Sequence, residues 1–304
     1  MFTIGKNFHV IHMSDDLDTL DAWYDDVFSV ARFMNHQFSD VLKRDASLVL
    51  IGDLCIEPMQ PSFRVEDWDK VAIGRFYNRF GKRWHSIAWY TEGPDDIAPL
   101  YKQLIDNDVR VYSGTGVPSA DGPPAGAIFT HPADTFTQLE FMAPAAGLGD
   151  PRFHGWFNAD WWATGHPLGI VQSSHVTLAV RDVEAARDRY VHAVGGKLLH
   201  EGDVALTQSR SAFVAVGDLV VELAQPIEPD STLAKDMEAH QQSLYAVTLQ
   251  VRDLPAARRY LESKGIAIAE SDDSTLLTDP STTHGAVFGF TTWQIPNDAR
   301  PRRG

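Results

Sequence analysis

The chain contains the same strand-like segment twice, and this repeat constrains the fold more than any other feature. Residues 52–61 read GDLCIEPMQP and residues 217–226 read GDLVVELAQP. A longer stretch repeats at nearly the same spacing, because HVIHMSDDLDTLDAWY begins at His9 and HVTLAVRDVEAARDRY begins at His175. One order of elements therefore recurs along the 304 residues, which predicts a duplicated domain.

Each half divides again into two smaller modules. The segment HSIAWYTEGPDDIAPLYKQLIDNDVRV, from His85, is similar to AVTLQVRDLPAARRYLESKGIAI, from Ala246. A module begins with an alternating apolar strand and continues with an Asp-led stretch whose apolar residues have helical spacing. Short strands separated by turn residues follow. The sequence therefore predicts four modules of β-α-β-β-β order.

The stretch 146–172 is expected to connect the two domains, because it is rich in Gly, Pro and Trp and has no period. This places an N-terminal domain at 1–145 and a C-terminal domain at 173–304. The aromatic residues of the linker are expected to pack between the domains or over a site. They are Phe153, Trp156, Phe157, Trp161 and Trp162. The final residues, ARPRRG, predict a short exposed tail.

Composition excludes several classes of partner and site. A formal net charge of −15 argues against nucleic acid and anionic membrane surfaces, which need basic patches. No apolar run approaches the roughly 20 residues of a membrane span, and the amino terminus lacks a secretory pattern, so a cytoplasmic location is expected. The single cysteine, Cys55, excludes an internal disulfide and a Cys-rich metal site. Its apolar neighbours predict a buried, inert thiol.

Together these features resemble the vicinal oxygen chelate superfamily. The resemblance rests on the tandem modules, the strands that open with His, the repeated Gly-Asp-apolar-Glu strand, and the module end HPADTFTQLEF from His131. That superfamily includes glyoxalase I, methylmalonyl-CoA epimerase, extradiol dioxygenases, and fosfomycin- and bleomycin-resistance proteins. The resemblance implies an α+β fold in which module pairs form two glyoxalase-like domains with cupped mixed sheets, and a cup that holds one divalent metal ion.

The resemblance also implies which residues bind the metal. In the N-terminal domain the ligand positions read His9, Glu57, His85 and Glu140. In the C-terminal domain the same positions read His175, Glu222, Ala246 and Gly289. Neither Ala nor Gly has a donor atom in its side chain. The resemblance therefore implies a complete site in the first domain and a degenerate one in the second, where His284 is the next candidate ligand.

The donor set has a physical rationale of its own. Two neutral imidazoles and two carboxylates suit an octahedral Ni²⁺, Co²⁺, Mn²⁺, Zn²⁺ or Fe²⁺ ion with two positions open for water or substrate. Strand alternation places His9 and His12 on opposite faces, so only one of them can enter the cup. His9 is preferred because it matches His175 in the repeat.

The remaining candidates are weighed against structural roles. Glu140 lies between Leu139 and Phe141, where a carboxylate is costly unless a positive group meets it. Glu57 is the weakest candidate, because Pro58 interrupts its strand and it could instead be an edge residue facing water. His131 is expected to shape a turn, and it could also donate a hydrogen bond to a ligand.

The resemblance implies a metal-dependent isomerase, epimerase or lyase that removes a proton from a small oxygenated substrate through a metal-bound enolate or enediolate. Glu140 is the first candidate for the base and Glu57 the second. The linker aromatics suggest an aromatic or bulky apolar substrate. No organic cofactor is expected, and the protein is expected to be a monomer or a homodimer.

Two alternatives stay open. One is an Fe(II)-dependent, extradiol-type dioxygenase, although such enzymes use two His and one Glu, typically in the second domain of a four-module chain. The other is a non-catalytic drug- or metabolite-binding protein of the bleomycin-resistance type. Its walls would be the linker aromatics.

Overall fold

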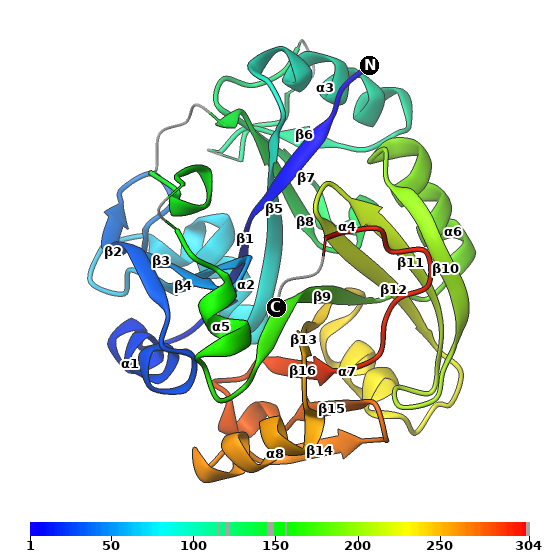
Figure 1. The fold of residues 1–304 in the computed structure, drawn as a ribbon. Helices are drawn as coiled ribbons and strands as arrows, with labels where there is room; N and C mark the ends of the chain where they lie inside the picture. Colours follow the sequence, from blue (N-terminus) through cyan, green and yellow to red (C-terminus); the bar gives the residue numbers. More distant parts are fainter. Residues whose placement is uncertain (115, 120–121, 145–148, 156, 302–304) are drawn as a thin grey trace.

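The computed structural model describes residues 1–114, 116–119, 122–144, 149–155 and 157–301. It contains two open, eight-stranded mixed sheets whose strands follow one another in the same order. In Figure 1 the first sheet runs from blue to green and the second from green to red. The α+β fold of tandem modules predicted from the sequence is confirmed.

The first sheet has the order β2-β3-β4-β1-β5-β8-β7-β6, so its two modules meet through the antiparallel pair β1 and β5. Its strands are β1 (Ile4–Met13), β2 (Ala31–Ser39), β3 (Arg44–Ile51), β4 (Leu54–Pro61), β5 (Arg83–Thr91), β6 (Val111–Tyr112), β7 (Ala127–Thr130) and β8 (Gln138–Met142). Its helices are α1 (Leu17–Phe28), η1 (Trp68–Lys70), α2 (Ala72–Phe80), η2 (Pro94–Asp96), α3 (Ile97–Asp106) and α4 (Pro132–Thr135).

The second sheet repeats this order as β10-β11-β12-β9-β13-β16-β15-β14. Its strands are β9 (Ile170–Ala179), β10 (Lys197–Val204), β11 (Ser209–Val216), β12 (Leu219–Pro226), β13 (Ser243–Val251), β14 (Ile268–Ser271), β15 (Thr275–Thr278) and β16 (Val287–Thr291). Its helices are α6 (Val183–Asp188), η5 (Arg189–Ala193), α7 (Thr232–His240), α8 (Leu254–Ser263) and η6 (Pro280–Thr282). The short helices η4 (Pro151–Phe153) and α5 (Asp160–Thr164) lie between the sheets in sequence.

The Asp-led segments begin helices because the aspartate side chain accepts a hydrogen bond from a free amide of the first turn. Asp16 caps α1 through the amide of Thr19, at 3.0 Å. Asp182 caps α6 through Ala185, at 3.0 Å, and Asp253 caps α8 at 2.8 Å. The same device therefore starts the helix in three of the four modules.

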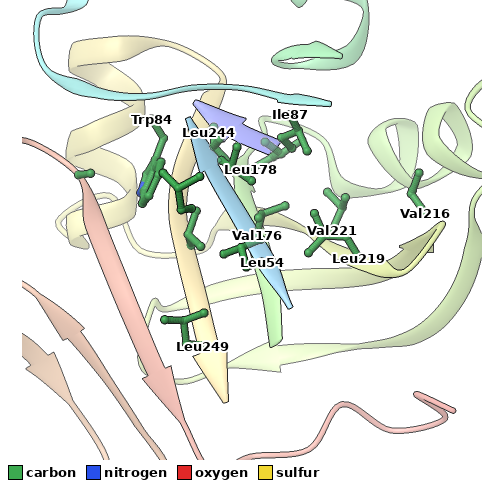
Figure 2. Close-up of a cluster of buried hydrophobic side chains, with 14 of the residues drawn as sticks. Leu54, Trp84, Ile87, Val176, Leu178, Val216, Leu219, Val221, Leu244 and Leu249 are labelled. Carbon is green, nitrogen blue, oxygen red and sulfur yellow. The ribbon is translucent and has the colours of Figure 1, made fainter. Parts of the chain in front are cut away.

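The two sheets share one hydrophobic core. Figure 2 shows Trp84 and Ile87 of the first sheet in one cluster with Leu178 and Leu244 of the second. The indole of Trp84 donates a 2.8 Å hydrogen bond across this interface to the carbonyl oxygen of Val287. The two domains therefore bury their apolar faces against each other, while the opposite faces remain for the cups.

A buried arginine clamp occurs in both domains, and the sequence pattern did not reveal it. The Arg152 guanidinium pairs with Asp150 and donates to the carbonyl oxygens of Phe8 and Asp53. Arg300 does the same in the second domain, where it pairs with Asp298 and donates to the carbonyls of Ser174 and Asp218. The prediction that this end of the chain is an exposed tail is therefore wrong for Arg300.

The linker aromatics have structural roles. Trp162 is buried, and its indole donates to the carbonyl oxygen of Phe28 at 2.9 Å. Phe157 packs beside Trp162, whereas Phe153 and Trp161 are about half exposed. Trp156 lies outside the described residues. Packing between the domains, one of the two roles expected for these residues, is therefore observed for Trp162.

Two further expectations concern membrane and thiol chemistry. No helix in the described ranges is long and apolar enough to cross a membrane. Cys55 is fully buried, and burial raises the pKa of its thiol, so the side chain is inert as expected.

Candidate active site

The cup of the first sheet contains a cavity of about 1110 Å³. All four residues that the sequence predicts as metal ligands line it: His9, Glu57, His85 and Glu140. They belong to β1, β4, β5 and β8, which are the four central strands of the sheet. Residues far apart in sequence therefore meet because the two modules join at β1 and β5.

His9 lies between the two carboxylates. Its Nε2 atom is 3.2 Å from Oε2 of Glu57 and 3.6 Å from Oε2 of Glu140. Two ligands at right angles around a metal with bonds of about 2.1 Å would be about 3.0 Å apart. Both ring nitrogens of His9 are buried without a hydrogen-bond partner, which costs free energy unless another group satisfies them. The chemistry of these donors fits a divalent metal ion.

The shell is not closed in this arrangement. Among the described residues, no group of three or more His, Cys, Asp or Glu side chains already has metal-binding geometry. Arg44 also contacts Glu57, with its guanidinium 3.2 Å from Oε1. A metal would therefore share Glu57 with Arg44, and small side-chain rotations would have to complete the shell.

His85 is prepared to act as a neutral ligand. Burial, with a smaller contribution from His9, lowers its pKa to about 4. Its Nδ1 atom is 2.8 Å from the hydroxyl of Ser86, and its ring packs edge-on against Phe76. The imidazole is thus neutral at pH 7, with Nε2 left for a metal.

The two carboxylates differ in their surroundings. Glu57 has a side chain only 4% exposed and pairs with Arg44. The side chain of Glu140 is 16% exposed, and among the ion pairs of the described residues it meets only His9. Glu140 is therefore the carboxylate that a molecule in the cavity can reach.

The second domain satisfies its glutamate internally. Glu222 accepts hydrogen bonds from Thr177 at 2.6 Å and from Ser211 at 2.8 Å, and His175 Nε2 lies 3.4 Å away. Burial alone would raise the pKa of Glu222, but these partners bring it below its usual value. In the first domain the two hydroxyls are replaced by the side chains of Ile11 and Ala46. The carboxylate oxygens of Glu57 consequently accept no hydrogen bonds from side chains at these two positions, whereas those of Glu222 do.

Strand pairing corrects one position of the degenerate set. His12 pairs with Trp84 in the first sheet, and Leu178 pairs with Leu244 in the second, so the position of His85 corresponds to Tyr245. The sequence prediction of Ala246 is therefore wrong by one residue, because it aligned β5 with β13 one residue out of step, whereas the two strands have the same pairing and the same bulge. Tyr245 packs in an apolar cluster of the second domain.

The other histidines considered from the sequence lie elsewhere or have structural roles. His12 faces away from the cup, as alternation predicts, and bonds the hydroxyl of Tyr24 at 2.8 Å. His131 lines the cavity, and its Nδ1 accepts from the amide of Ala133, so it shapes the turn before α4. His284 packs against Trp23 on the first domain's helix α1.

Comparisons with known proteins agree with the fold. Residues 174–276 match the family described as Glyoxalase/Bleomycin resistance protein/Dioxygenase superfamily. A mutant of 4-hydroxymandelate synthase from Streptomyces coelicolor has a similar structure, with a TM-score of 0.68 over 97% of this chain and 95% of that one, at 11% identity. Residues 174–276 thus match this superfamily, and the fold of the chain is that of tandem vicinal oxygen chelate modules.

A shorter solved structure matches part of the chain. Methylmalonyl-CoA epimerase from Mycobacterium tuberculosis matches 40% of this chain and 87% of its own, with 22% identity and a TM-score of 0.37. No curated protein sequence matches the chain. Similarity at these identities concerns the fold, since one fold supports many reactions.

The cavity is also lined by residues that the sequence analysis did not single out. Arg44 is the most important, and comparison with the repeat could have found it, because the second domain has Ser209 there. The walls are aromatic, but none of the four described linker aromatics lines the cavity. The aromatic residues in the cavity walls are Phe8, Phe38, Phe76, Phe80, Tyr112, Phe129 and Phe136.

Proposed function

We propose that this protein is a metal-dependent isomerase, epimerase or lyase that removes a proton from a carbon atom of a small oxygenated substrate. One observation carries the proposal. Glu140 is a carboxylate without an arginine partner in the described part of the chain, it faces a large cavity, and it lies 3.6 Å from His9. A carboxylate in this position can act both as a ligand and as a base.

We propose that the domain of residues 1–145 holds one divalent ion through His9, Glu57, His85 and Glu140. When bound, such an ion (Ni, Co, Mn, Zn or Fe(II)) supplies a positive charge that stabilises negative charge developing on substrate oxygens. The identity of the metal does not follow from the donor types, since each of these ions accepts imidazole and carboxylate ligands.

The residues of the chain divide the remaining work. Glu140 takes the proton, because it is the more accessible carboxylate. Glu57 is held against the Arg44 guanidinium, which makes it the second candidate for the base. The aromatic walls exclude water, and the interaction between Glu140 and the substrate is stronger in a medium of low dielectric constant.

A second candidate function has its own observation. The ion pair between Arg44 and Glu57 leaves His9, His85 and Glu140 as a set of two histidines and one carboxylate. Such a set with open positions is typical of non-haem Fe(II) oxygenases. A ring-cleaving dioxygenase that works from the first domain is therefore the alternative, and a non-catalytic binding protein would require no metal at all.

Elemental analysis of protein purified without added metal or chelator tests the proposal first. Bound metal should then support exchange of the α-hydrogen of mandelate with deuterium from solvent, whereas Glu140→Gln should retain partial metal affinity but lose the exchange. Glu222→Gln is the matched control and should exchange at the wild-type rate. If iron is found and oxygen is consumed with catechol, the dioxygenase takes the place of the isomerase. Protein without metal supports the binding protein.

A further inference from the structure

We propose that the oxygenated substrate of this cavity has an apolar body and one anionic group, a carboxylate or a phosphate. Arg79 and Arg181, with His240 beside them, hold this group at the mouth of the cavity. The proposal rests on the proposed function in that it assigns a substrate class to the same site.

The charge of the cavity is opposite to that of the protein. Its described lining includes Arg44, Arg75, Arg79 and Arg181, and its only acidic residues are Glu57 and Glu140. The whole chain carries a formal charge of −15. A basic hollow with apolar walls in an acidic protein concentrates anions, because low-dielectric walls focus the field of the positive groups.

Arg79 and Arg181 are not committed to partners within the protein. Other arginines pair with carboxylates, such as Arg83 with Asp236 at 3.0 Å and Arg110 with Asp134 at 2.7 Å. No ion pair in the described part of the chain involves Arg79 or Arg181. A planar guanidinium has several donors that match the oxygens of a carboxylate or phosphate. The two side chains are therefore available to an anion that enters the cavity.

Contacts around Phe80 and Gln242 bring these groups together. The Arg79 guanidinium lies 4.9 Å from the centre of the Phe80 ring, and the centre of the His240 ring lies 6.3 Å from the centre of the Phe80 ring. The amide of Arg181 donates to Gln242, which also lines the cavity. Nδ1 of His240 is 2.8 Å from Asp236, so Nε2 is the ring nitrogen left for a ligand.

The anion site needs both domains. Arg79 lies in α2 of the first domain. In the second domain, Arg181 lies between β9 and α6, and His240 is the last residue of α7. The second domain thus contributes to substrate binding in the first. Arg83, which pairs with Asp236, fixes this arrangement across the interface.

The remainder of the cavity fits an apolar body. Phe76, Phe129 and Phe136 are among its aromatic walls, and its volume of about 1110 Å³ greatly exceeds that of a free carboxylate or phosphate ion. Apolar walls with a few polar groups at one place are typical of sites that bind and orient drug-sized molecules. The anion at the mouth would orient the substrate with its other end toward His9 and Glu140.

Calorimetric titration of the full chain, freed of metal by dialysis against a chelator, tests the proposal. The probes are phenylacetate, phenyl phosphate and the neutral analogue 2-phenylacetamide. At least one anion should bind about tenfold or more tightly than the amide, and the preferred anion identifies the group. Arg79→Gln and Arg181→Gln should each weaken that binding about fivefold or more, whereas the exposed Arg210→Gln should not.

Equal affinity for the anions and the amide would overturn the proposal. So would unchanged binding in both arginine variants when circular dichroism shows that they are folded. Because the titration uses metal-free protein, it is independent of the metal chemistry. Anion binding in a protein that neither retains metal nor exchanges deuterium would reject the proposed function alone, and the reverse result would reject the anion site alone.

Discussion

Ala88 is the direct neighbour of Glu140 in the parallel pairing of β5 with β8. The corresponding neighbours in the second sheet are Thr248 and Gly289, and a Cβ atom on Gly289 would lie 2.3 Å from the Thr248 hydroxyl. The larger side chain of the pair is therefore on β8 in the first domain and on β13 in the second. A small side chain on β5 leaves room for the carboxylate of the first domain, whereas the threonine closes that room in the second.

Ala88→Thr should therefore crowd Glu140, reduce metal affinity at least tenfold and destabilise the fold by about 1–3 kcal/mol through overpacking. Adding Glu140→Gly should recover part of the stability, because the second domain already combines Thr with Gly. Metal competition and urea unfolding of the single and double variants measure both effects. Thr248→Ala is the control and should leave metal affinity unchanged. Purely additive effects in the double variant would contradict steric coupling between the two residues.

His85→Ala should remove the metal, whereas His175→Ala should leave about one ion per chain. The reason is that His85 completes the first shell, while His175 already lies beside a glutamate whose oxygens are satisfied by hydroxyls. Emission spectrometry after dialysis gives the metal content of each variant. Equal loss in both variants would show that the ligand positions are wrongly assigned.

The buried His12 should make the protein sensitive to acid. Burial lowers its pKa from 6.5 to about 3, and the charges of His284 and Lys82 act in the same direction. The ring is held between the Tyr24 hydroxyl and the His284 carbonyl. Because the unfolded chain takes up a proton at higher pH than the folded chain, this stability is complete above about pH 6.5 and is lost as the pH falls toward 3.

His12→Leu should flatten this dependence by up to about 1.4 kcal/mol per pH unit. The second domain has a leucine, Leu178, at the position of His12, in the same core cluster as Tyr190. The Tyr190 hydroxyl donates to the carbonyl oxygen of Thr135 instead of to a histidine. Urea unfolding of both proteins between pH 7.5 and 4.5 makes the comparison. Parallel curves would assign the acid sensitivity to another group.

Arg152→Met should destabilise the protein by about 3–5 kcal/mol, because it leaves the Asp150 carboxylate buried without its cation. Arg300→Met should cost less, since its side chain is 15% exposed and that of Arg152 only 4%. Denaturant unfolding measures both. Arg210→Met, at an exposed pair, should stay within about 0.5 kcal/mol of the wild type. If Arg300→Met left the free energy of unfolding unchanged, this end of the chain would contribute nothing to stability, as the prediction of an exposed tail implies.

The sequence predicted the architecture because duplication leaves its record in the order of residues. Paired occurrences of His9 with His175 and of Glu57 with Glu222 revealed the repeat, and alternation assigned His12 to the opposite face. The position of Tyr245 was missed because β5 and β13 have little sequence similarity, and only their pairing with β1 and β9 fixes the register between them. Arg300 was missed because its partners are backbone carbonyls, which every residue possesses.

By itself, the sequence determined the four modules, their pairing into two domains and the candidate donors, since these depend on local periodicity and on residue identity at repeated positions. Only the tertiary structure decided which groups meet. It placed Arg44 against Glu57, left Glu140 open to the cavity and brought Arg181 of the second domain to the mouth of the first cup. Those relationships depend on how strands and domains pack over long sequence separations, and distances across a fold are not encoded in the spacing of residues along the chain.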